Sequence, residues 1–228
     1  PRLRPPRHVY LWLLLPGFFF AGDLAVWHWS MAKTTVANST LLANCAPLWV
    51  TIIAVFLFKE HITRRYLVGL ALAFVGVYLL VKGNLYLSKE TLVGDALGVI
   101  TAFFYGSYQL SVRHVRGHFS TIALMAGSGV TTCVLLFLVA WLSGESFFTT
   151  EAPWWRVWSP LLALAVIVHT VGQSSIAYAL AHLPSTFASV TLMFQPVVTA
   201  VWGWLILGEA IGPWQGLGGI VILVAIAL

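Results

Sequence analysis

The stretch APLWVTIIAVFLFKEHITRRYLVGL, residues 46–70, has a counterpart in QPVVTAVWGWLILGEAIGPWQGLGG, residues 195–219. In each stretch a proline opens an apolar run, a glutamate follows in a short turn, and a glycine lies in the next apolar run. Four pairs match at one offset of 149 residues: Pro47 with Pro196, Glu60 with Glu209, Ile62 with Ile211, and Gly69 with Gly218. This regularity predicts two copies of one helical unit.

The composition predicts that this helical unit lies in a lipid bilayer. Of the 228 residues, 60% are hydrophobic and 8% are charged, whereas soluble domains carry about 25% charged residues. Eight apolar segments reach or approach the roughly 20 residues that a helix needs to cross the hydrocarbon core. We therefore expect an all-α integral membrane protein with eight transmembrane helices. The segments lie near Val9–Ala32, Thr35–Phe58, Arg64–Val81, Asp95–Val115, Ser120–Leu142, Trp158–Ala181, Ser185–Gly208 and Pro213–Leu228.

The formal charge of +5 is spread over the turns between these segments. Basic residues at such positions meet lipid headgroups and fix topology. The expected partners are therefore the bilayer and a small-molecule substrate, not nucleic acid. The turns on one face carry eight Lys or Arg residues and those on the other carry four, so the richer face of this multi-pass protein is predicted to be cytoplasmic. The two sets are Arg2, Arg4, Arg7, Lys59, Arg64, Arg65, Arg113 and Arg116, against Lys33, Lys82, Lys89 and Arg156.

The two repeated stretches are expected to cross the membrane in opposite directions, because the second lies five helices after the first and five is odd. Inverted repeats of this kind are typical of secondary transporters. Residues 9–82 are predicted to be the last three helices of a first repeat, residues 93–228 the five helices of a second, and residues 1–8 a cytoplasmic loop. A complete first repeat would need two further helices ahead of Pro1, so we expect a ten-helix parent of five plus five.

Three stretches resemble a known family. ANSTLLANCAPLWVTIIAVFLFKE (37–60), followed by VGLALAFVGVYLL (68–80), resembles the fourth and fifth helices of EamA-type proteins of the drug/metabolite transporter (DMT) superfamily. GDALGVITAFFYGSYQLSVRHV (94–115) resembles the start of that family's second repeat, and TLMFQPVVTAVWGWLILGE (191–209) its ninth helix. The resemblance covers nearly the whole chain. It implies two inverted five-helix repeats, without the first two helices here, and transport of amino acids, nucleotide-derived metabolites or amphipathic drugs.

Asp23 is one of seven acidic residues and lies inside FFFAGDLAVWHWS, residues 18–30. A charged side chain at the bilayer centre costs about 2.5–3.5 kcal/mol on insertion scales, so Asp23 must face protein or water. At helical spacing it shares a face with Trp27 and Ser30. Three roles are open: a hydrogen bond within the bundle, contact with a substrate amine or hydroxyl, or proton exchange. The repeat-equivalent residue is Gln173, so the repeat itself does not require a charge, and this favours a functional role.

Pro47 and Pro196 lie near the middle of their predicted helices. A proline there removes a backbone hydrogen bond and kinks the helix, and in lipid such backbone is confined to the protein interior or a cavity wall. Each kink is either a packing feature or part of a binding pocket. Polar and aromatic side chains at similar depth favour the pocket: Asn38, Thr40, Asn44, Tyr105, Tyr108, Gln109, Gln173, Ser174, Ser175, Ser189, Thr191 and Gln195. The expected substrate- or proton-binding residues are Asp23, Trp27, Asn44, Tyr105, Tyr108, Gln173 and Gln195.

The function that these features favour is secondary transport of small metabolites or drugs by alternating access, with no enzyme activity. An alternative is an intramembrane serine-type hydrolase, because Ser128 lies between glycines and His169 falls in the next apolar segment. A non-transporting membrane fragment is a third interpretation. The chain has no GxxxxGK[ST] loop for ATP. Cys45 and Cys133 lie in apolar runs without metal-site spacing, so no metal or cofactor is expected.

The charge asymmetry makes a topological prediction. In a background without Cys45 and Cys133, a cysteine introduced by Arg64→Cys should react with a membrane-impermeant thiol reagent only from the cytoplasmic side. The matched variant Lys33→Cys should react from outside intact cells. Labelling of position 64 from outside would contradict the assignment.

Overall fold

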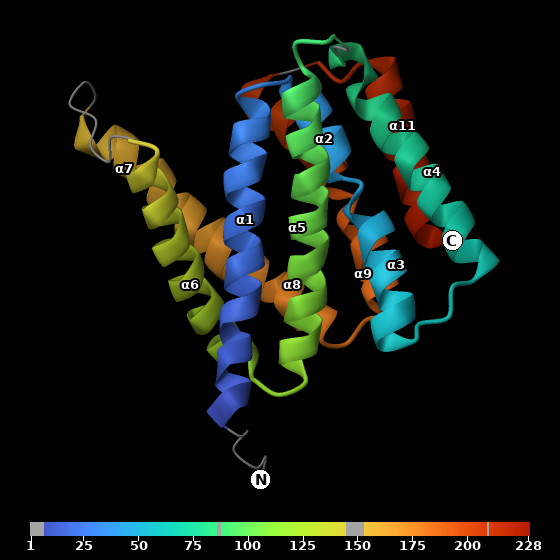
Figure 1. The fold of residues 1–228 in the computed structure, drawn as a ribbon. Helices are drawn as coiled ribbons and strands as arrows, with labels where there is room; N and C mark the ends of the chain where they lie inside the picture. The colour runs from blue at the N-terminus through green and yellow to red at the C-terminus, as the bar shows by residue number, and fades with distance from the viewer. Residues whose placement is uncertain (1–6, 86–87, 145–152, 209) are drawn as a thin grey trace.

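The computed structural model describes residues 7–85, 88–144, 153–208 and 210–228, and the regular structure in these ranges is helical (Figure 1). The helices form eight segments whose limits agree with the predicted ones within a few residues. The segments are η1 (Arg7–Leu13) with α1 (Leu14–Met31); α2 (Val36–Ala43) with α3 (Ala46–Phe58); α4 (Arg64–Val81), followed by η2 (Lys82–Asn84); α5 (Leu92–Arg116); α6 (Thr121–Leu142); α7 (Trp154–Ala163) with η3 (Leu164–Gly172) and α8 (Gln173–Leu180); α9 (Ser185–Leu192) with α10 (Gln195–Trp202) and η4 (Gly203–Leu207); and α11 (Pro213–Ala227).

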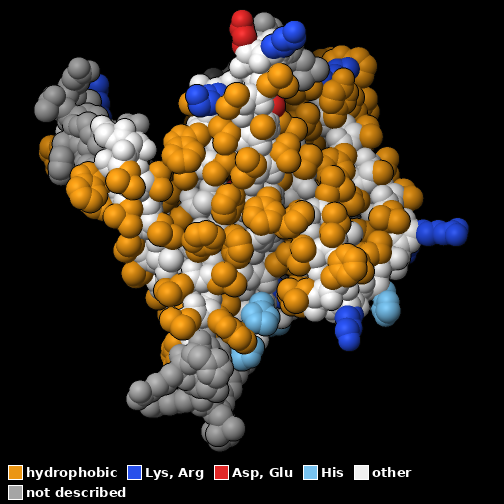
Figure 2. All heavy atoms as spheres, in the orientation of Figure 1, with side chains coloured by type: hydrophobic (Ala, Val, Ile, Leu, Met, Phe, Trp, Pro, Cys, Tyr) orange, Lys and Arg blue, Asp and Glu red, His pale blue; other side chains and the backbone are white. Residues whose placement is uncertain are grey.

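The outer surface of this bundle is apolar. Six of the helical segments in the described residues are long and apolar enough to cross a membrane. Figure 2 shows hydrophobic side chains over most of the visible face, with Lys and Arg at its margins. Phe56 is 80% exposed and Ile122 is 82% exposed, which would be costly in water but is favourable against lipid chains. The expected all-α membrane fold is confirmed.

The two other segments, α11 and α5, are not among these six, for separate reasons. Helix α11 has 15 residues, fewer than the roughly 20 that a full crossing needs. Helix α5 has 25 residues and is the innermost helix, since α1, α2, α3, α8 and α9 all pack against it. Its residues from Gly106 to Val112 are all buried, and they include polar side chains. The polarity of α5 therefore reflects its place inside the bundle, where side chains contact protein instead of lipid.

Two segments are interrupted ahead of a proline. Pro47 lies in the first turn of α3, after a two-residue turn that ends α2, and Pro196 has the same place in α10 after α9. At each predicted kink the α-helix is interrupted by a two-residue turn, Asn44 and Cys45 or Met193 and Phe194, whose residues keep right-handed helical φ and ψ values. Because proline has no N–H, it fits the first turn of a helix and interrupts the middle of one.

The helix boundaries recur at the offset of the sequence repeat. Helices α2 and α9 begin at residues 36 and 185, α3 and α10 at 46 and 195, and α4 and α11 at 64 and 213. Lys59 and Gly208, 149 residues apart, both take a left-handed conformation, with φ of 53° and 70°. Glu209, the repeat partner of Glu60, lies outside the described residues.

Helices α4 and α11 lie side by side (Figure 1) because two glycines allow their backbones to touch. A Cβ atom on Gly218 would lie 2.6 Å from the Gly76 carbonyl oxygen, and one on Gly76 would lie 2.8 Å from the Gly218 oxygen. Val77 and Ile222 are fully buried beside this contact. Small residues at such contacts are a general means of helix association in membranes.

Replacing one of these glycines should separate the two helices. Gly218→Ala is expected to lower stability by about 1–3 kcal/mol, because the new methyl group meets backbone atoms that cannot move independently. Gly216→Ala on the same helix is the control, since nothing lies within 4 Å of its Cβ position. It should be neutral or stabilising because Ala favours helix over Gly. Thermal unfolding in detergent measures both, and equal Tm values would refute the tight contact.

Candidate functional site: a polar centre between two broken helices

Asp23 lies on α1 against the middle of the central helix α5. Its side chain is 9% exposed, and its carboxylate has no hydrogen-bond partner among the described residues. The carboxylate is near enough to the hydroxyls of Tyr105 and Tyr108 to interact with them electrostatically. An acidic side chain thus faces protein at the centre of the bundle, as predicted, with none of the donors that would satisfy it structurally.

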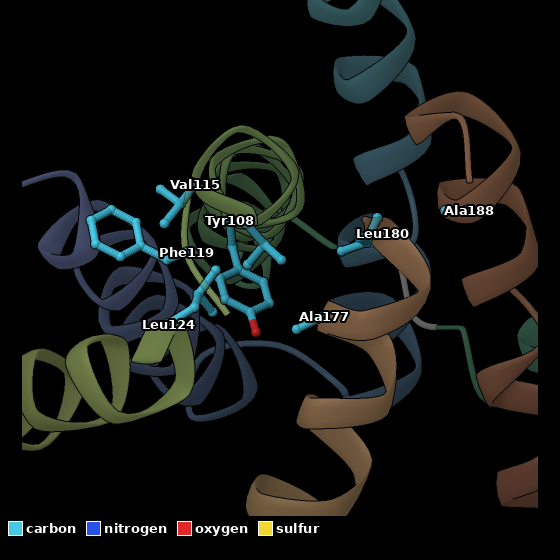
Figure 3. Close-up of a cluster of buried hydrophobic side chains, with 8 residues drawn as sticks. Tyr108, Val115, Phe119, Leu124, Ala177, Leu180 and Ala188 are labelled. Atoms are coloured by element: carbon cyan, nitrogen blue, oxygen red, sulfur yellow. The ribbon is translucent and has the colours of Figure 1, made fainter. Parts of the chain in front are cut away.

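Hydrogen bonds of Tyr105 and Tyr108 connect α5 to α10 and to α8. Their rings are nearly parallel, with an angle of 20° between planes and 6.4 Å between centroids. The Tyr108 hydroxyl donates to Gln173 Oε1 on α8 at 3.2 Å, and Gln195 Nε2 on α10 donates to the Tyr105 hydroxyl at 3.3 Å. Figure 3 places the Tyr108 ring between Leu124 of α6 and Ala177 of α8, inside an apolar cluster.

A small cavity of about 10 Å³ lies where the two helix breaks face α5. That volume is about what one water molecule needs. Asn44 and Pro47 line it from the α2–α3 break, and Ser189 and Gln195 from the α9–α10 side, while α5 contributes Tyr105 and Gln109. The breaks therefore place polar side chains and interrupted backbone around one point, the arrangement in which membrane transporters hold polar ligands.

Five of the seven predicted binding residues thus form one connected centre: Asp23, Tyr105, Tyr108, Gln173 and Gln195. A sixth, Asn44, lines the adjacent cavity. Within the part of the chain that the structure describes, no hydrogen bond joins Trp27 to them, and its ring contact is with His28, at 5.6 Å between centroids. Ser30, which shares the Asp23 face by helical spacing, is used elsewhere: Ser30 Oγ donates to the Gly94 carbonyl at 2.8 Å and joins α1 to α5.

Other polar residues of the expected pocket are used elsewhere. Asn38 Nδ2 donates to Asp95 Oδ1 at 3.0 Å, far along the helix from the breaks. Ser175 and Thr191 donate to the carbonyls of Val171 and Phe187 four residues earlier, at 2.8 and 2.9 Å. Short hydroxyl side chains in helices commonly bond in this way. The position of a residue along its predicted transmembrane helix therefore did not distinguish these residues from the ones that line the cavity.

The serine–histidine pair of the hydrolase alternative does not form. Ser128 Oγ donates to the Met125 carbonyl at 3.4 Å, and the His169 ring contacts the Phe20 ring at 5.8 Å between centroids. Within the described residues no hydrogen bond joins Ser128 to His169. Ser128 instead lies at the contact of α6 with Gly17 of α1, which agrees with a packing role for its glycine context.

Glu60 makes a second polar cluster, at the end of the bundle where α3 meets α9. Its carboxylate accepts from the N–H groups of Ser185 and Thr186 at 2.9 and 3.2 Å, and from Thr186 Oγ1 at 2.7 Å. It also pairs with Arg113, whose guanidinium donates to Ser185 Oγ at 2.6 Å. We call Glu60, Arg113, Ser185 and Thr186 the end latch.

The end latch caps a helix that cannot cap itself. The residue before α9 is Pro184, which has no polar side chain for the exposed N–H groups of the first turn. Lys59, in its left-handed conformation, ends α3 just before Glu60. Glu60 therefore supplies the cap of α9 from the end of α3. From the sequence, Arg113 was used only to predict which face is cytoplasmic. Its position near the C-terminus of a mostly buried helix was the feature that could have predicted an acidic partner.

Three comparisons bear on what this arrangement belongs to. The chain is 26% identical to the pseudopaline exporter CntI of Pseudomonas aeruginosa (strain UCBPP-PA14) over 213 residues, which are 93% of this chain and 72% of the exporter. It is 25% identical to the threonine/homoserine exporter RhtA of Escherichia coli K12, covering 96% and 72%. It is 27% identical to the riboflavin transporter ImpX of Fusobacterium nucleatum, covering 82% and 64%.

The fold and the family agree. A solved crystal structure of another protein, 18% identical, superposes with a TM-score of 0.82 over 98% of this chain and 76% of that one. The model of the EamA-like transporter family matches residues 1–82 and 92–228. This chain belongs to the EamA-like transporter family. It is a multi-pass membrane transporter, and its matched relatives named above are transporters rather than enzymes.

The end latch makes a prediction for stability. Glu60→Gln keeps the size of the side chain but removes the charge that pairs with Arg113, so stability should fall by about 1–3 kcal/mol, as for other hydrogen bonds to charged groups. Glu90→Gln, in an exposed turn, is the control and should change stability by less than about 0.5 kcal/mol. Equal Tm values for the two variants in detergent would show that the latch does not stabilise this conformation.

Proposed function

We propose that this EamA-family chain is a secondary transporter, without enzyme activity, that moves a small polar metabolite by alternating access between two inverted repeats. Support comes from helix boundaries that recur at 149 residues and from the two broken helices that face one cavity. The two proposed repeats are those expected from the sequence: residues 9–82 belong to one and residues 93–228 to the other. Half-helices whose ends meet at a ligand site are the usual basis of such transport.

Asp23 is the observation that carries this proposal. A carboxylate buried without hydrogen-bond donors is costly when ionised, and Asp23 has no donor among the described residues. Binding of a proton or of a cationic group of the substrate removes this cost and lowers the free energy of the protein. A group with this property at the centre of the bundle couples ligand occupancy to conformation, because the carboxylate is solvated in one state and enclosed in the other.

Tyr105, Tyr108, Gln173 and Gln195 are proposed to complete the substrate site. Their hydrogen bonds at 3.2 and 3.3 Å join α5 to α8 and α10, so a ligand that competes for one of these groups changes how the helices are held together. These four side chains are polar or aromatic, and the acidic Asp23 lies near the two tyrosines, which suits a small amine, hydroxyl or amide compound. Amino acids such as threonine and homoserine, exported by one relative, fall within this class.

The end latch is proposed to be the gate that closes one side of the cavity. Glu60 on the first repeat holds the first turn of α9 on the second, together with Arg113. Opening on that side requires Glu60 to release the N–H groups of α9, which water can then satisfy. The cost of release is therefore moderate, as a reversible gate requires.

The proposal is tested by transport into proteoliposomes that contain the purified protein and a pH-sensitive dye. We expect an imposed substrate gradient of threonine, homoserine or riboflavin to move protons in the wild type. Asp23→Asn preserves shape but does not titrate, so it should abolish proton movement. Asp23→Glu keeps the titratable group and should retain part of it.

The variant also separates the two roles of Asp23. A proton carrier predicts that Asp23→Asn still binds substrate but loses pH-driven uptake, whereas a substrate contact predicts weaker binding at every pH. Wild-type binding, transport and pH dependence in Asp23→Asn would leave Asp23 with a structural role and would remove the main support for the proposal.

A further inference from the structure

Gln109 is a buried polar side chain on α5 whose hydrogen-bonding groups are unused. It is 1% exposed, and neither its Nε2 nor its Oε1 atom has a partner among the described residues. Buried amide groups are nearly always paired in native proteins, because an unpaired one keeps the cost of its lost hydration. Gln109 therefore destabilises the conformation seen here, and its presence calls for a reason other than packing.

The other buried polar side chains near it on α5 are satisfied. Thr101 Oγ1 donates to the Leu97 carbonyl at 3.0 Å, and Ser111 Oγ donates to the Tyr108 carbonyl at 2.8 Å. Ser107 Oγ accepts from the indole of Trp49 at 3.3 Å. Among the described residues of α5, the other buried side-chain polar atom without a partner is Arg116 Nε at the C-terminal end of the helix, so Gln109 is the one such residue of α5 that lines the cavity.

The place of Gln109 indicates where a partner would come from. It lines the cavity between the two helix breaks, one turn after Tyr105 and across from Asn44. Asn44 donates one N–H to the Thr40 carbonyl at 2.8 Å, and its amide oxygen has no partner among the described residues. Among the described residues, the cavity thus has unused amide acceptors and unused amide N–H donors on two walls, from Gln109 and Asn44.

An amide side chain specifies the chemistry of its complement. Gln109 presents an N–H donor beside a carbonyl acceptor. A carboxylate would satisfy only the donor and an ammonium group only the acceptor. A carboxamide or lactam edge, with its own N–H and C=O side by side, satisfies both. Sites built to hydrogen-bond a substrate group discriminate strongly against analogues that lack it.

We propose that Gln109 is a specificity-determining residue, which recognises a carboxamide or lactam edge on the transported molecule from between the two helix breaks. This inference rests on the proposed transport function, since a cavity of about 10 Å³ admits such a group only when the half-helices move apart. Asp23, near Tyr105 and Tyr108, then acts on a different part of the same ligand or on a proton. Transport and recognition are thereby assigned to different side chains.

The test uses uracil and nicotinamide as probes, with 1,3-dimethyluracil and N,N-dimethylnicotinamide as matched compounds without the N–H donor. Binding is measured on the purified protein by calorimetry and by ligand-induced shift of Tm. We expect at least one amide probe to bind the wild type and its methylated form to bind at least tenfold more weakly. Gln109→Met, of similar length but without polar atoms, should lose at least tenfold affinity for that probe.

A second readout separates recognition from a structural role. Because its unused amide is destabilising, Gln109→Met without ligand should unfold at a higher temperature than the wild type. Thr101→Val, which removes a satisfied hydroxyl from the same helix, should not raise Tm and should leave probe binding unchanged. An unchanged or lower Tm for Gln109→Met would mean that a bound water satisfies the amide, and would overturn the proposal.

The remaining outcomes are also decisive. Failure of both amide probes to bind the wild type, or equal binding by Gln109→Met, would refute the amide proposal. Proton-coupled transport that is lost in Asp23→Asn but unchanged for every substrate in Gln109→Met would refute it while leaving the proposed function intact. A wild-type protein that moves none of the transport substrates would instead refute the proposed function.

Discussion

The hydrocarbon core of a bilayer offers no hydrogen-bond partner to a peptide group, and the organisation of this protein depends on that constraint. Each segment that faces lipid is helical, because a helix satisfies its own backbone. The two helix interruptions, ahead of Pro47 and Pro196, lie beside the cavity that α5 also lines. The same constraint that makes the fold helical therefore confines irregular backbone, and the polar side chains beside it, to one cavity.

Helix α5 connects this cavity to the rest of the bundle. Tyr105 and Gln109 reach the cavity, Tyr108 bonds to α8, and Arg113, about one turn after Gln109, pairs with Glu60. A change at the centre and a change at the end latch thus act on one rigid element. Rigid elements that contact two sites are the physical requirement for coupling between them, which is why a transporter benefits from a long polar helix in its interior.

The two polar regions differ in how fully they are satisfied. In the end latch, the Glu60 carboxylate receives four donors, so it stabilises the conformation seen here. At the centre, Asp23 and Gln109 have no such partners among the described residues. A protein that held both regions equally well would remain in one conformation. In the mechanism that we propose, strong contacts at the end latch and unmet ones at the centre leave the energy of ligand binding available to drive the change of state.

The sequence by itself determined the membrane fold, the limits of the eight helical segments and the repeat, because apolar length and proline and glycine positions act locally. It also identified Asp23 as a candidate site residue, since a charged residue within an apolar run can be recognised from the sequence without the structure. Only the tertiary structure decided which polar residues converge. Asn38 was expected at the depth of the pocket and Ser30 on the face of Asp23, yet both bond elsewhere, and Gln109 emerged through its lack of partners among the described residues. Hydrogen bonding between helices depends on their rotation and contact, which periodicity does not specify when the surrounding lipid makes most helix faces apolar.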